Sequence, residues 1–169
     1  MPDDLIIGRG GSGDSRAIPL GTKSGTQVRN ERRRERSPDS LRAAVRIIAE
    51  NHPLARLRSI TSTYNCVGMV FASRRTWVDT DDVLLFLNED GYRQVRAPEV
   101  GDVIVYRNDR SEVKHVGVII DNRPVEHPGH PFLLVMSKWG GDGEYLHALS
   151  DAPPLFGSAS DYWTERVTL

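Results

Sequence analysis

The sequence has a single cysteine, Cys66, and no apolar run approaching the roughly 20 residues that a membrane-spanning helix requires. One cysteine excludes an internal disulfide and any zinc site built from several thiolates. The first residues are acidic, and the apolar residues 5–7 are too few for the core of a signal peptide. We therefore expect a cytoplasmic protein that does not enter a membrane, with export that needs no cleaved signal left open.

Aromatic residues are also few, at 7 %, and the formal net charge is only −1. Residues 1–36 hold eight Lys and Arg against five Asp and Glu and are rich in glycine, which predicts an N-terminal arm rather than a domain. Glu31 and Glu35 interrupt its arginine run, and no aromatic residue nearby could stack on a base. We do not expect a nucleic-acid partner, and the arm could instead contact a protein.

The remaining residues, 37–169, are expected to form one α+β domain that begins with helices. Ser37 is a good capping residue, and apolar residues follow it at helical spacing. Asn65 can cap a second helix that starts at Cys66, and a third helix is expected within residues 80–91.

From residue 92 onward the apolar pattern changes to the two-residue period of strands, interrupted by turn residues. The expected strands are residues 103–106, 113–120, 132–137, 145–147 and 162–167. Short connections between consecutive strands favour antiparallel pairing. The sequence thus predicts helices packed on an antiparallel sheet of about five strands, without internal repeats.

The position of Cys66 suggests chemistry. A thiol at the first residue of a helix lies at the positive end of the helix dipole, which favours the nucleophilic thiolate. Such a nucleophile needs a histidine within hydrogen-bond reach. His115 is the best candidate because it starts a β-strand in which the small Gly117 would leave room for another element.

Three blocks of sequence carry a family resemblance: residues 65–70 around Cys66, residues 98–106, and residues 115–119 after His115. Together they resemble the NlpC-like and CHAP-like cysteine peptidases, bacterial members of the papain-like superfold, over about residues 60–140. The resemblance implies a Cys66 nucleophile, a His115 base, no cofactor, and cleavage of a peptide or protein amide bond through an acyl-enzyme.

The family's third catalytic residue lies on the following strand, where this sequence offers Ser137 instead of the usual His, Asn, Gln or Glu. A hydroxyl accepts the imidazole hydrogen less strongly than a carboxylate does. His147 and Glu126 are alternatives if the fold brings either of them close.

The expected oxyanion and substrate contacts lie beside these residues. The Cys66 amide and a polar group from Thr63, Tyr64 or Asn65 would form the oxyanion hole, and Trp139 could line a substrate groove. The loop at residues 126–130 has no third well-spaced donor, so no metal site is predicted.

The first hypothesis is therefore a thiol-dependent peptidase or amidase. Two alternatives stay open. One is a non-catalytic papain-like interaction module, suggested by the weak third residue. The other is a bacterial toxin or effector with deamidase or acyl-transfer activity, docked through residues 1–36. The oligomeric state is not determined by the sequence.

Overall fold

The computed structural model describes residues 17–123 and 133–167. The helices are α1 (Pro38–Asn51), α2 (Cys66–Phe71) and α3 (Val83–Glu89), with short 3-10 turns η1 (Thr80–Asp82), η2 (Leu149–Asp151) and η3 (Pro154–Phe156). The strands are β1 (Asn30–Glu31), β2 (Arg56–Ile60), β3 (Trp77–Val78), β4 (Arg93–Val95), β5 (Val103–Arg107), β6 (Val113–Asp121), β7 (Leu134–Trp139), β8 (Gly143–Ala148) and β9 (Ser158–Thr164). In these ranges no helix is long and apolar enough to cross a bilayer.

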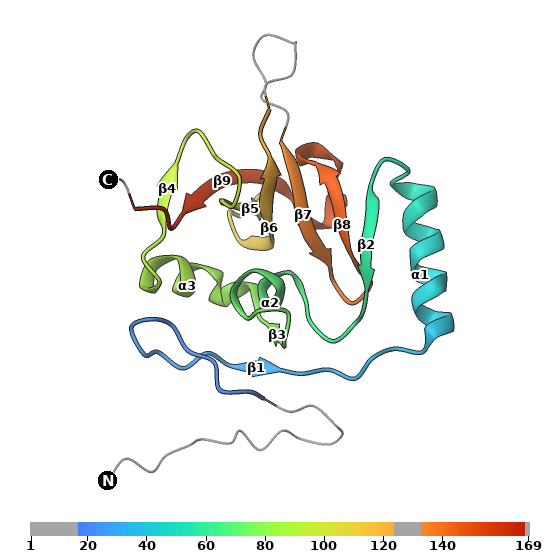
Figure 1. The fold of residues 1–169 in the computed structure, drawn as a ribbon, viewed down its shortest axis with the longest axis horizontal. Coiled ribbons are helices and arrows are strands. Elements are labelled where there is room, and N and C mark those ends of the chain that lie inside the picture. The colour runs from blue at the N-terminus through green and yellow to red at the C-terminus, as the bar shows by residue number, and fades with distance from the viewer. Residues whose placement is uncertain (1–16, 124–132, 168–169) are drawn as a thin grey trace.

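The α+β prediction is confirmed, but the sheet is larger than expected. Seven strands pair antiparallel in the order β2-β8-β7-β6-β5-β9-β4 (Figure 1), not about five. The two unpredicted strands, β2 and β4, lie at the two edges. Both faces of an edge strand can remain partly exposed to solvent, and β2 carries exposed Arg56 and Arg58. Such a strand lacks the apolar alternation that reveals a buried one.

The two faces of the sheet bury different clusters. On one face, α2 and α3 pack against Val103, Val105 and Val116 of β5 and β6. On the other face, Ile104 and Ile119 of the same strands pack with residues of β7, η2 and the following turn. Because side chains alternate along a strand, neighbouring residues of β5 and β6 belong to different layers.

Both expected helix caps are present. The Ser37 hydroxyl accepts the Ser40 N–H of α1 at 3.3 Å. The Asn65 side chain does more: its oxygen accepts the N–H of Gly68 at 3.0 Å and of Val78 at 3.2 Å, and its Nδ2 donates to the Val78 carbonyl at 2.7 Å. Asn65 therefore fixes the start of α2 to strand β3.

Residues 17–36 are extended, as an arm would be, but they are packed on the domain expected to begin at residue 37. Val28 is 5 % exposed and belongs to the core with α2 and α3. Strand β1 pairs with β3, and the Glu35 carboxylate accepts the Ser62 N–H. Short apolar insertions such as Val28 are weak sequence signals, because the partner surface exists only in the folded domain. Residues 1–16 of the expected arm lie outside the described residues.

We expect Asn65→Ala to lower the free energy of unfolding by about 2–4 kcal/mol, because it removes a cap and leaves two buried backbone groups of Val78 without partners. Ser37→Ala removes a comparable cap at an exposed position and should cost only about 1 kcal/mol. Urea unfolding of both variants measures the difference. Equal losses would mean that Asn65 acts as a cap alone.

Candidate functional site

Cys66 is buried between helix α2 and the sheet. Its side chain is buried at the start of α2, which contacts β6 and β7, and it packs in the same cluster as Val116. Burial raises the pKa of the thiol, and this effect outweighs hydrogen bonding from the Val116 backbone and the nearby charge of Lys138. The expected helix position is present, but the thiol is not activated by it.

Strands β6 and β7 separate beside this thiol. Their described pairing runs from Asp121↔Leu134 to Val118↔Met136, and Ser137, Lys138 and Trp139 continue along β8 alone. The side chain of Lys138 is fully buried, donates to the Gly140 carbonyl at 2.6 Å and lies 5.2 Å from the centre of the Tyr64 ring. Burial lowers the pKa of Lys138 to about 8.

The residues expected to form an oxyanion hole are engaged in structural contacts. The Tyr64 hydroxyl donates to Glu144 at 2.7 Å, and the same carboxylate accepts from Arg74 at 2.6 Å. Burial and this carboxylate raise the pKa of Tyr64 to about 12. The side-chain amide of Asn65 is hydrogen-bonded to Gly68 and Val78, as described above. Neither side chain presents a free donor beside Cys66.

His115 lies on the other face of the sheet. Its ring stacks on Phe156 of η3, with centroids 3.9 Å apart, and is 5.5 Å from the Tyr106 ring. It is fully buried, and neither ring nitrogen has a hydrogen-bond partner among the described residues. Burial, with a smaller contribution from nearby His147, holds the pKa of His115 well below its ordinary value.

The expected pair of Cys66 and His115 is therefore not formed. Val116 packs with Cys66, and His115, one residue earlier on β6, points to the opposite face. A side chain placed on Gly117 would meet Val135 and Ser137, so Gly117 makes room for β7 and not for α2. Alternation along one strand separates the two groups that the sequence pattern suggested would meet.

Ser137 and Trp139 lie on the same face of the sheet as His115, but Ser137 is hydrogen-bonded to a different histidine. The Ser137 hydroxyl is 2.8 Å from His147 Nε2 and accepts the Trp139 indole N–H at 3.1 Å. His147 Nδ1 is 2.8 Å from the Ala148 carbonyl, which can only accept, so this nitrogen carries the proton and Nε2 accepts from Ser137. Ser137 thus orients His147 and not His115, while Glu126 lies outside the described residues.

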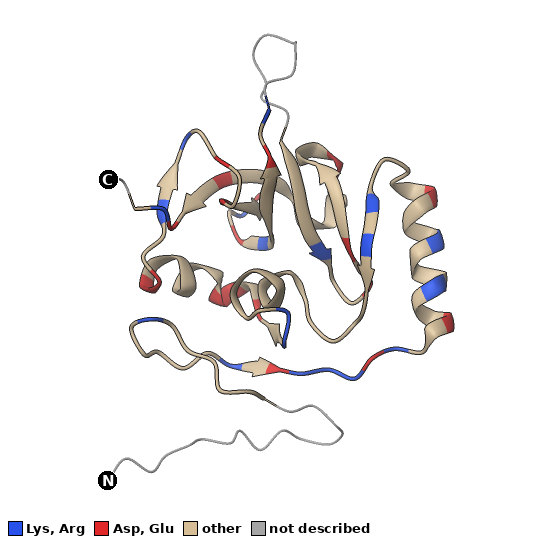
Figure 2. Cartoon of the chain, viewed as in Figure 1, with Lys and Arg blue, Asp and Glu red and all other residues tan. Residues whose placement is uncertain are grey.

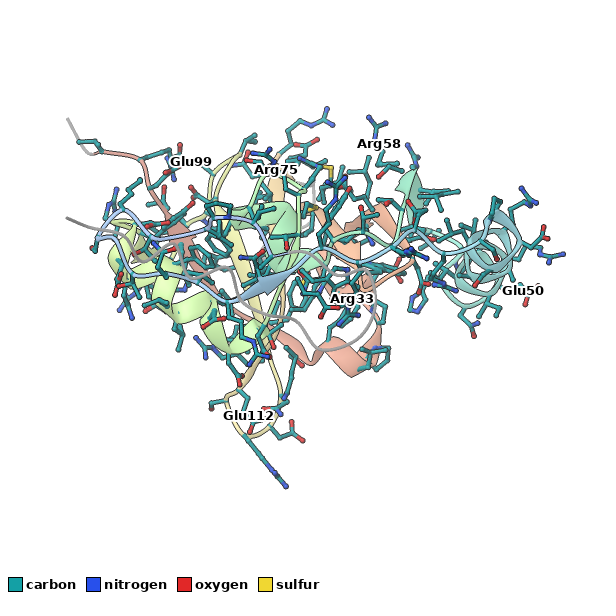
Figure 3. All side chains as sticks on the ribbon, turned by 90° about the horizontal axis from the view of Figure 1, so that it is seen from below. Arg33, Glu50, Arg58, Arg75, Glu99 and Glu112 are labelled. Atoms are coloured by element: carbon teal, nitrogen blue, oxygen red, sulfur yellow. The ribbon has the colours of Figure 1, made fainter. Side chains whose placement is uncertain are left out.

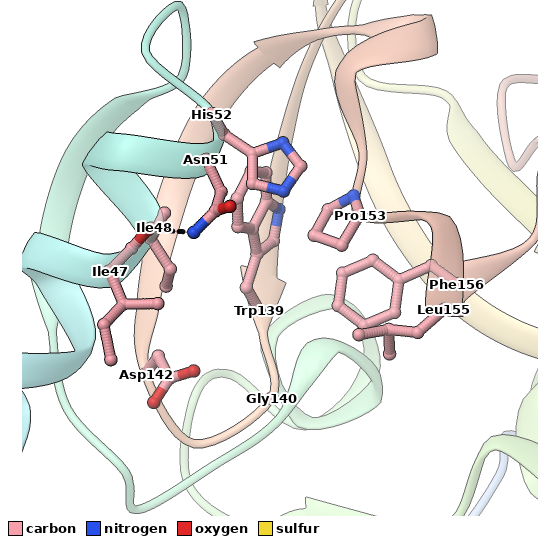
Figure 4. Close-up of a pocket in the computed structure, with 10 residues that line it drawn as sticks. All are labelled: Ile47, Ile48, Asn51, His52, Trp139, Gly140, Asp142, Pro153, Leu155 and Phe156. Carbon is pink, nitrogen blue, oxygen red and sulfur yellow. Dashed lines mark hydrogen bonds between the residues drawn. The ribbon is translucent and has the colours of Figure 1, made fainter.

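An apolar groove opens above this layer, between α1 and η3 (Figure 4). Its volume is about 330 Å³. Figure 4 shows Trp139 between Ile47, Ile48 and Asn51 of α1 on one side and Pro153, Leu155 and Phe156 on the other, with His52, the residue after α1, above it. Leu155 and Ile47 are 76 % and 59 % exposed, so large apolar side chains remain in solvent around the opening. Trp139 does line a groove, but on the face opposite Cys66.

Most charged side chains are distributed around the fold; the groove itself is lined by one of them, Asp142. Lys and Arg follow the segment between β1 and α1 and lie on β2, whereas Asp and Glu mark both ends of α3 (Figure 2). Part of the arginine run is used in packing: the Arg33 guanidinium lies 3.6 Å from the centre of the Trp77 ring, and Arg36 pairs with Asp142. Arg33 projects from the middle of the underside in Figure 3. No group of three metal-ligating side chains gathers among the described residues.

No protein-family model matches this chain, and searches of curated proteins and of solved structures found no match. The site is therefore assigned from its geometry. Sequence reasoning predicted that Trp139 could line a groove but missed the other walls, because they come from α1 and η3, which are far from Trp139 in the chain. The clearest available signal was the apolar, proline-rich segment at residues 152–156, followed by Gly157.

We expect Cys66 to react with iodoacetamide at pH 7.5 at least about tenfold more slowly than glutathione, because burial hinders access and disfavours the thiolate. Mass spectrometry of the intact protein measures the rate. The same protein in concentrated urea provides the control and should react at the rate of an ordinary thiol. Faster labelling of the folded protein would contradict the buried position.

The buried neutral His115 should make stability pH-dependent. The pKa of His115 in the folded protein lies below the ordinary value of 6.5. Below about pH 6.5, His115 therefore binds a proton in the unfolded chain but stays neutral in the folded one. Stability should then fall with decreasing pH by up to about 1.4 kcal/mol per pH unit for this group. His115→Phe keeps a ring against Phe156 and should flatten the slope between pH 6.5 and 5.

Urea unfolding at several pH values measures this slope. Tyr106→Phe is the matched control, since it alters a neighbour of His115 that does not titrate in this range. An unchanged slope in His115→Phe would assign the pH dependence to other groups, of which His147 is the nearest with a pKa lowered by burial.

Proposed function

We propose that this protein is a non-catalytic binding module whose ligand site is the apolar groove between α1 and η3. The observation that carries the proposal is the combination of an open apolar groove with a cysteine and a histidine separated by the sheet. The groove is of the size that holds a small apolar ligand or one large side chain of a partner. The polar residues among its apolar walls are Asn51, His52 and Asp142, and the Asp142 carboxylate is paired with Arg36.

The packing of α1 also supports binding at this place. Leu41 is its only buried residue, so most of the helix's apolar side is incompletely covered. Ile48 and Trp139 form part of the groove wall where α1 approaches the sheet. A ligand that fills the groove would complete the burial of α1 and stabilise its position.

A papain-like ancestry is part of the proposal. A helix that starts at a capped cysteine and packs on antiparallel strands supports it, as do the three sequence blocks around Cys66, Asp102 and His115. The same module without an accessible thiol would be an interaction protein that keeps a peptidase scaffold. The proposed interaction module needs no cofactor.

A thiol-dependent amidase is the second candidate. Its support is that Cys66 begins α2, with the Val116 backbone as a hydrogen-bond partner and the charge of Lys138 nearby. Catalysis would require another base, since His115 faces away, and Lys138 has the lowered pKa that such a role needs. Rapid alkylation of the folded protein, lost in Cys66→Ala, would favour this candidate over the binding module.

The groove is tested with octan-1-ol as a neutral apolar probe, followed by ¹H–¹⁵N spectra of the folded protein. We expect shifts of the Trp139 indole signal and of the α1 and η3 amides. Leu155→Glu and Ile47→Glu each place a charge at the groove wall and should weaken binding by about 1 kcal/mol, about fivefold.

Leu54→Glu is the matched control. Leu54 is 80 % exposed and does not line the groove, so this variant should bind as the natural protein does. Equal weakening in all three variants, or shifts that avoid Trp139, would place the binding site elsewhere.

A further inference from the structure

His115 is the polar side chain that the fold leaves least satisfied. It is fully buried and both of its ring nitrogens lack partners among the described residues. The polar neighbours are already engaged: the Tyr106 hydroxyl donates to the Leu149 carbonyl at 3.1 Å, and both nitrogens of His147 are used by Ser137 and Ala148. A buried polar group without a hydrogen-bond partner destabilises the folded state, so its presence here calls for a reason.

Phe156 separates this ring from the groove. It stacks on the His115 ring and also lines the groove, so it lies between the two. It belongs to η3, a single turn whose backbone bonds run from Phe156 N–H to Pro153 and from Gly157 N–H to Pro154. Gly157 has φ of 79°, a conformation that favours glycine and ends the turn. Phe156 is thus the side chain that lies between the groove and His115.

The chemistry around the ring selects a ligand. Tyr106 of β5, His147 of β8 and Phe156 of η3 face His115, and no Asp, Glu, Lys or Arg among the described residues is hydrogen-bonded to it. A carboxylate satisfies the ring and balances its charge: the neutral ring takes up a proton from solvent as the carboxylate binds, and the resulting ion pair is neutral overall. An alcohol can form only a neutral hydrogen bond with the ring, which is weaker than the charge-assisted bond of a carboxylate.

We propose that the groove takes a monocarboxylic acid with an apolar body, and that its carboxylate pairs with His115 after Phe156 rotates aside. This inference rests on the proposed binding function of the groove. The apolar body would lie against Trp139 and Leu155, and the head would reach the ring that Phe156 now covers.

The experiment compares octanoate with octan-1-ol, which have the same apolar chain and different heads. Isothermal titration of the natural protein at pH 7 should give about tenfold or greater preference for octanoate, since a charge-assisted hydrogen bond contributes about 1.5–3 kcal/mol. His115→Phe should lose this preference and keep octan-1-ol binding. Phe156→Ala, which removes the cover, should strengthen octanoate binding.

Proton uptake gives a readout that needs no variant. Octanoate is ionised at pH 7, so pairing with neutral His115 must draw close to one proton from the buffer, whereas octan-1-ol should draw none. Titrations in phosphate and in Tris, which have different ionisation heats, measure this number. Leu155→Gln, which adds polarity without charge, should weaken both ligands equally, because it acts on the shared apolar body.

The outcomes separate the two proposals. Binding of both ligands without a preference, or octanoate binding without proton uptake, would overturn the role of His115 and leave the groove standing. Failure of both ligands to bind would overturn the groove as well. A preference that persists in His115→Phe would assign the carboxylate to another group, such as His52, the residue after α1 that lines the groove.

Discussion

Strand β6 turns neighbouring side chains to opposite faces of the sheet, and the arrangement of both faces depends on this alternation. Val116 joins the layer of α2 and α3, while His115 joins the aromatic layer under η3. A shift of one residue in this strand would exchange the two and bring an imidazole toward Cys66. The shift is opposed by Gly117, which is the only residue small enough for the close approach of β7 at that position. The strand register therefore decides which chemistry the protein can perform.

The two faces differ in how their polar groups are satisfied. On the α2 face, Tyr64, Arg74 and Glu144 form a connected network beside Cys66. Such a network holds its members in fixed positions, and it leaves the thiol buried without an activating base. On the other face, Ser137, Trp139 and His147 satisfy one another, and His115 stands alone against Phe156. The unsatisfied ring and the open groove lie on the same side of the sheet, separated by a single aromatic side chain, which is why we connect them.

The sequence predicted the parts of the fold that rest on local chemistry. The caps of α1 and α2 and the strong strands β5 and β6 follow from residue types and spacing. The edge strands β2 and β4 were missed because edge positions do not require a buried face. The packing of residues 17–36 was missed because its anchors are single residues, such as Val28, whose partners come from distant helices. Of the candidate site, the position of Cys66 at a capped helix start and the place of Trp139 in a groove wall were accessible by such reasoning.

By itself, the sequence determined that Cys66 starts a helix, that His115 lies in a strand and that the second half forms antiparallel strands. Each of these statements depends on residues close together in the chain. Only the tertiary structure decided on which face of the sheet each side chain emerges, and how α1, β7 and η3 meet around Trp139. The reason is physical: a strand's local pattern fixes the alternation of its two faces, but which face meets which layer is set by packing between elements far apart in the chain.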